Sequence, residues 1–132
     1  MRSRILIGIV VVIATLGIGA LTSRAGDHAG ARQWSIVNFP DPILVKGQLV
    51  MGPVLIVHDS EKMAQGEACT SFYRFEPGVG PKDEIVSFHC KPIAREKVEQ
   101  TTFAYAAAPN GCKRLTEYQI AGDAEAHEVP VK

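Results

Sequence analysis

The chain has 132 residues, of which 46% are hydrophobic, and its 14 basic and 14 acidic residues give a formal net charge of zero. This length allows one small domain in addition to a leader segment. The charge balance lacks the basic excess typical of nucleic-acid-binding domains, so no nucleic-acid partner is expected.

The first predicted element is an apolar helix near the amino terminus. Arg2 and Arg4 precede an uncharged run from Ile5 to Leu21, and small residues follow in Ser23-Arg24-Ala25. The run is long for the core of a secretory signal and close to the lower limit of a membrane span. Residues 1–25 are therefore predicted to form either a signal peptide or a single transmembrane anchor. The leading arginines favour a cytoplasmic start, which places the rest on the periplasmic or extracytoplasmic side, anchored to the cytoplasmic membrane or released after cleavage.

Three regions follow this leader. Residues 26–33 are expected to be a linker, residues 34–121 a β-rich exported domain, and residues 122–132 a flexible acidic tail. Without the three leader arginines, the exported part has 11 basic residues against 14 acidic ones, a net charge of −3. This charge disfavours electrostatic binding to anionic lipid surfaces.

The exported domain shows short β-type runs punctuated by glycine and proline. Val54–His58 is a continuous β-branched run, typical of a strand covered on both faces. Asp59 or Ser60 is expected to cap one or two helical turns through Met63. Asn110-Gly111 marks a hairpin between two of the runs. The expected strands are 34–37, 43–51, 54–58, 69–75, 84–90, 102–106 and 115–120, and 94–100 is expected to be a second short helix.

These elements predict a mainly β fold. A small antiparallel sandwich or partly open barrel with one or two short helices, preceded by the N-terminal hydrophobic helix, accommodates six or seven short strands.

The three cysteines all lie in the exported part, where disulfides persist. If strands 69–75 and 84–90 pair with Phe75 opposite Glu84, Cys69 lies opposite Cys90 and within disulfide reach. The sequence therefore predicts a Cys69–Cys90 disulfide and a free Cys112. The alternative is three buried, reduced cysteines.

A metal site is a competing interpretation of the same region. His58, His89, Cys69 and Cys90 are the candidate ligands, because imidazole and thiolate bind copper, zinc and iron. The chain has no Cys-x-x-Cys and no His-x-x-x-His spacing. His89 and Cys90 are neighbours on a predicted strand, so their side chains should point to opposite faces. A metal held by both cysteines would exclude the disulfide.

No catalytic or cofactor-binding residue is assigned, and no cofactor is expected. The Gly-x-Ser-x-Gly pattern is missing, no glycine-rich phosphate loop precedes a helical pattern, and the neighbours His58 and Asp59 do not form a catalytic relay. The chain is not expected to be an enzyme.

Two functional hypotheses follow. The first is a non-enzymatic exported or membrane-anchored β-rich module that binds a protein partner or serves as an accessory subunit of an envelope membrane complex. The alternative is a small periplasmic metal-binding or redox protein that uses His and Cys ligands.

Overall fold

The computed structural model describes residues 32–132, so the predicted apolar helix from Ile5 to Leu21 lies outside the described residues. Eight strands form one mixed sheet in the order β4-β3-β2-β1-β7-β8-β5, with β6 also paired to β7. The strands are β1 (Arg32–Val45), β2 (Gln48–Asp59), β3 (Thr70–Glu76), β4 (Gly80–Phe88), β5 (Lys91–Ala94), β6 (Thr102–Ala107), β7 (Lys113–Gln119) and β8 (Glu125–Glu128). The helical elements are α2 (Ser60–Ala64) and the 3₁₀ turn η2 (Pro109–Gly111).

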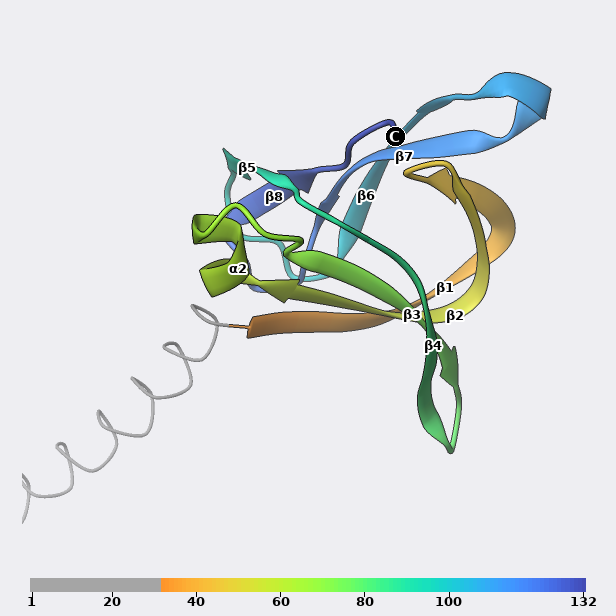
Figure 1. The fold of residues 1–132 in the computed structure, drawn as a ribbon, viewed down its shortest axis with the longest axis horizontal. Helices are drawn as coiled ribbons and strands as arrows, with labels where there is room; N and C mark the ends of the chain where they lie inside the picture. Colours follow the sequence, from red (N-terminus) through yellow and green to blue (C-terminus); the bar gives the residue numbers. More distant parts are fainter. Residues whose placement is uncertain (1–31) are drawn as a thin grey trace, which may run out of the picture. The chain divides into compact units, whose positions relative to one another are not determined.

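The predicted mainly β class is confirmed, and the arrangement is a single mixed sheet that does not close into a barrel (Figure 1). All pairings are antiparallel except that of β1 with β7, which is parallel. Within residues 32–132, no helix has the length and hydrophobicity needed to cross a membrane.

Strands β1 and β2 form a long bent hairpin, which the sequence interpretation had divided at the wrong places. Lys46 and Gly47 form the turn with φ values of 48° and 80°, inside the predicted strand 43–51. Gly52 does not break β2; it has a φ of 82° and pairs with Phe39, where the register of β1 shifts before Ile43. An irregularity in β1 opposite a left-handed glycine lets both strands bend together, so the prolines nearby do not end either strand.

Strand β2 also differs from expectation in its burial. Val54, Ile56 and His58 are buried, whereas Leu55 and Val57 are only half-buried. The prediction that 54–58 is covered on both faces is therefore wrong, because only one face of this strand lies against the core.

Two predicted local elements are confirmed. Helix α2 begins after Asp59, whose carboxylate accepts hydrogen bonds from the backbone N–H groups of Glu61 and Lys62. Strands β6 and β7 pair as an antiparallel hairpin, with Asn110 in the left-handed region at a φ of 68°.

The carboxyl-terminal third differs most from the predictions. Residues 95–101 are irregular rather than helical, and the segment expected to be a flexible tail contains β8. Strand β8 pairs with both β5 and β7, and Ala126, His127 and Val129 are buried. The hydrogen bonds of two sheet ladders and the burial of three side chains stabilise this segment as a strand, although its acidic composition is typical of a flexible tail.

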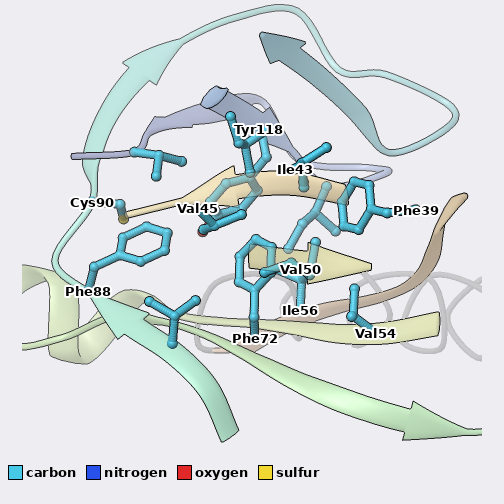
Figure 2. Packing of buried hydrophobic residues seen from close by; sticks show 14 of the residues in the cluster. Phe39, Ile43, Val45, Val50, Val54, Ile56, Phe72, Phe88, Cys90 and Tyr118 are labelled. Atoms are coloured by element: carbon cyan, nitrogen blue, oxygen red, sulfur yellow. The ribbon is translucent and has the colours of Figure 1, made fainter. Parts of the chain in front are cut away.

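The core lies between the two halves of the sheet. Phe72 of β3 packs against the rings of Phe88 and Tyr118, and the hydroxyls of Thr70 and Tyr118 share a hydrogen bond across the core. Burial raises the pKa of Tyr118 well above its usual value, so this phenol stays protonated. Figure 2 shows Cys90 at one end of this cluster, next to Phe88.

Candidate functional site

Three of the four predicted metal ligands meet at one end of the core. His58 comes from the end of β2, Cys69 immediately precedes β3, and Cys90 lies two residues after β4. One ligand atom from each of these side chains lies within 4.8 Å of the others, and all three side chains are buried. We call this cluster the His/Cys centre.

His58 has an unusual environment for a polar side chain. It is 0% exposed, and within the described part of the chain neither ring nitrogen has a hydrogen-bond partner. Burial, reinforced by repulsion from His127, lowers the pKa of His58 to about 4. The imidazole is therefore neutral at physiological pH, which is the form that binds a metal ion.

The separation of the two cysteine sulfurs of the centre lies between the length of a disulfide bond and the contact distance of two unbonded thiols. The Sγ atoms of Cys69 and Cys90 are 2.7 Å apart, and the Cys90 backbone N–H donates to Cys69 Sγ at 3.2 Å. Burial, followed by the neighbouring Cys69 thiol, raises the pKa of Cys90. Without a metal ion or an oxidant, Cys90 is therefore a protonated thiol rather than a reactive thiolate.

The two cysteines meet although the register of β3 with β4 differs from the predicted one. Thr70 pairs with Phe88, one residue from the register that would place Cys69 opposite Cys90. Farther along the irregular ladder, Phe75 pairs with Pro81 rather than with Glu84. Both cysteines lie just beyond the pair of Thr70 and Phe88, where Cys69 N–H still donates to Phe88 O at 3.0 Å. Because the regular ladder has ended, the Cys90 side chain turns toward Cys69 despite the shift.

His127, which the sequence interpretation placed in the tail, lies beside the centre. Its ring stacks on that of His58 with centroids 3.9 Å apart, and its Nδ1 is 3.6 Å from Cys90 Sγ. Its Nε2 is 3.1 Å from a carboxylate oxygen of Asp123. When Nε2–H donates to this carboxylate, Nδ1 faces the Cys90 sulfur as a hydrogen-bond acceptor.

The fourth predicted ligand, His89, borders the centre from the solvent side and is not one of its three clustered ligands. Its side chain is exposed, with Nδ1 3.2 Å from Glu67 O and 3.9 Å from Cys69 Sγ. His89 is exposed and Cys90 is fully buried, although both side chains reach Cys69 Sγ. Cys112 belongs to the β6–β7 hairpin and lines a separate hollow of about 470 Å³ with Phe39 and Tyr105.

Met63, Asp123 and His127 are neighbours of the centre that the sequence did not reveal as a group. Met63 Sδ is 3.8 Å from Cys90 Sγ. None of these residues has a ligand-type spacing to the cysteines, and they reach the centre through α2 and through the pairing of β8. Only the hydrophobic character of Met63 in an otherwise polar helix hinted that it points inward.

Comparisons with protein-family models, curated proteins and solved structures found no match. The chemistry of the site therefore has to be judged from its own residues. A neutral imidazole and two adjacent thiols can bind a transition metal ion, and the two thiols alone can form a disulfide. The buried sulfurs are poorly placed to attack a substrate.

Proposed function

We propose that this protein binds one soft or borderline transition metal ion, copper or zinc, through His58, Cys69 and Cys90. The observation that carries this proposal is the burial of His58 with two unpartnered ring nitrogens beside two cysteine sulfurs. An unsatisfied buried polar group costs about 1–3 kcal/mol, and coordination at one nitrogen would remove much of this cost. A metal ion also favours loss of the thiol proton, which offsets the raised pKa of Cys90.

The proposal predicts one equivalent of bound metal on the reduced full-length chain. Titration with Co²⁺, a spectroscopic substitute for zinc, should give thiolate-to-cobalt absorption, and Zn²⁺ should displace the cobalt. At a free zinc concentration 100 times the Kd, the free energy of unfolding should rise by about 2.7 kcal/mol. Substitution of Cys69 or Cys90 with serine should remove the absorption.

Cys112→Ser is the matched control, because Cys112 lies in the separate hollow and should be dispensable for binding. We also propose that oxidation joins Cys69 to Cys90 in a disulfide, which leaves Cys112 as the free thiol and prevents metal binding. A wild-type protein that is reduced at all three cysteines yet binds neither ion would contradict the metal proposal.

We place this function on the extracytoplasmic side of a membrane. The apolar run from Ile5 to Leu21 and the arginines before it support this location, as either an anchor or a cleaved signal. For the architecture we propose a partly open barrel, which is supported by the hydrogen bond between Thr70 on β3 and Tyr118 on β7 across the core.

A second candidate function, binding to a protein partner in an envelope complex, is favoured by an exposed apolar face. Trp34 and Ile36 are 62% and 47% exposed and pair with the half-buried Val57 and Leu55 on the neighbouring strand. These four side chains line a hollow of about 330 Å³ together with Arg32, Phe75 and Pro81. Contiguous apolar surface of this kind is a frequent mark of interaction sites.

This candidate predicts that Trp34→Ser combined with Ile36→Ser releases a partner without unfolding the domain. Surface substitutions usually change stability by less than about 0.5 kcal/mol, so the thermal midpoint and metal binding should be retained. Quantitative purification of the full chain from solubilised membranes should show a stoichiometric neighbour with the wild type and none with the double variant. Leu49→Ser, at an exposed position outside this hollow, is the control. An unaccompanied wild-type monomer would argue against the candidate.

A further inference from the structure

A third sulfur atom lies beside the His/Cys centre. Met63 Sδ is 3.8 Å from Cys90 Sγ, which in turn is 2.7 Å from Cys69 Sγ. The centre therefore combines two thiols, one thioether and the free nitrogens of His58. Three of these four donors are soft sulfur ligands.

The local structure directs Met63 toward the centre. Helix α2 starts immediately after His58 and Asp59, and the Asp59 carboxylate fixes its first turn. Glu61, Lys62 and Ala64 are exposed, whereas Met63 is half-buried and packs against the core. The inward-facing position of this helix is thus occupied by a thioether rather than by a branched aliphatic side chain.

Met63 is also the most accessible of the four donors. His58 and Cys90 are 0% exposed and Cys69 is 3% exposed. An ion that approaches from the side of α2 would meet the thioether before it reaches the buried thiols. Methionine side chains are flexible, so small movements of Sδ are inexpensive.

The type of donor decides which ion this set favours. Protein zinc sites use cysteine, histidine and carboxylate ligands. Thioethers are soft ligands, and together with thiolates they favour copper(I). A thioether next to two cysteines therefore adds affinity for copper(I) with little effect on zinc.

We propose that the His/Cys centre is a copper(I) site in which Met63 is a ligand and sets the preference for copper over zinc. This inference rests on the metal-binding function proposed above and specifies its ion.

Substitution of Met63 with leucine tests the proposal. Leucine keeps the volume and hydrophobicity but removes the sulfur, so packing should change little. The reduced full-length chain, in detergent and without oxygen, is titrated with copper(I) against the chromophoric chelator bicinchoninate and separately with Zn²⁺ against a zinc chelator. Met63→Leu should weaken copper(I) binding about tenfold, which corresponds to about 1.4 kcal/mol, and leave the zinc affinity unchanged.

Met51→Leu is the matched control, because Met51 is 57% exposed on β2. This substitution should change neither the copper(I) affinity nor the zinc affinity. X-ray absorption of the copper-loaded wild type gives an independent readout: three sulfur ligands are expected, and two in Met63→Leu. The role of Met63 would be overturned if Met63→Leu weakened the binding of both ions equally or left the copper affinity unchanged. It would also be overturned if copper in the wild type had only two sulfur ligands. Stoichiometric zinc with no copper(I) binding would overturn only the copper assignment, whereas binding of neither ion would also reject the proposed function.

Discussion

Replacement of His58 with leucine is expected to make the metal-free protein more stable while it abolishes metal binding. The imidazole is fully buried with both nitrogens unpartnered, and a leucine of similar size has no polar group to desolvate. We expect the free energy of unfolding to rise by about 1–3 kcal/mol, the usual cost of such a group. For a domain of this size, each kcal/mol corresponds to roughly 4–8 °C in the thermal midpoint.

The metal affinity should move in the opposite direction. Loss of a direct ligand should lower the metal affinity by more than the roughly 10–100-fold that is typical when a residue hydrogen-bonded to a ligand is removed. Chemical denaturation with a chelator present, together with a metal titration, measures both effects on one preparation. Met51→Leu is the control, because Met51 is exposed on β2 and its replacement should change neither quantity. A His58→Leu variant that is less stable than the wild type and binds metal normally would show that His58 has only a packing role.

Acid should destabilise the metal-free protein well before most carboxylates titrate. Burial lowers the pKa of His58 to about 4 from an unfolded value of 6.5. The unfolded chain therefore binds the proton more tightly than the native protein. The contribution of neutral His58 to the free energy of unfolding is fully present above pH 6.5 and is lost as the pH falls toward 4. At about 1.4 kcal/mol per pKa unit, the loss is on the order of 3 kcal/mol.

The groups near His58 determine the size of this effect. His127 opposes protonation by repulsion, whereas Asp123 and Asp59 favour it and limit the lowering of the pKa. The difference in the free energy of unfolding between the wild type and His58→Leu, measured with a chelator from pH 7.5 to pH 4, isolates the contribution of this histidine. As the pH falls, the free energy of unfolding of His58→Leu should increase relative to that of the wild type. A difference that stays constant across this range would contradict the neutral, buried state of His58.

The parts of the fold that could be predicted are those encoded within a few neighbouring residues. The Asp59 cap and the Asn110-Gly111 turn depend on local hydrogen bonds and on residues that tolerate a positive φ. The bend shared by β1 and β2 was not predicted, because proline and glycine between apolar runs are typical of the end of a strand. Here Gly52 faces the irregular part of β1 and the hairpin continues.

The candidate site was predictable in the same partial way. A hairpin between β3 and β4 brings Cys69 and Cys90 together, and that expectation tolerates the one-residue error in register. His127 could not be found because its position depends on the parallel pairing of β1 with β7 and on the pairing of β7 with β8. The pairing of β1 with β7 joins segments far apart in the sequence. Strand β8 follows β7 closely, but it is short and acidic and carries no alternating pattern that would reveal a strand.

The separation of the donors along the chain has a consequence for how such a protein would be assembled. His58 and Met63 lie before Cys69, and Cys90 lies after the complete hairpin of β3 and β4. A partial chain that emerges from a ribosome or a translocon and ends before Cys90 could not hold the ion as the finished domain does. Loading would therefore follow the pairing of β2, β3 and β4, and the bound ion would tie these three strands together at one end of the core.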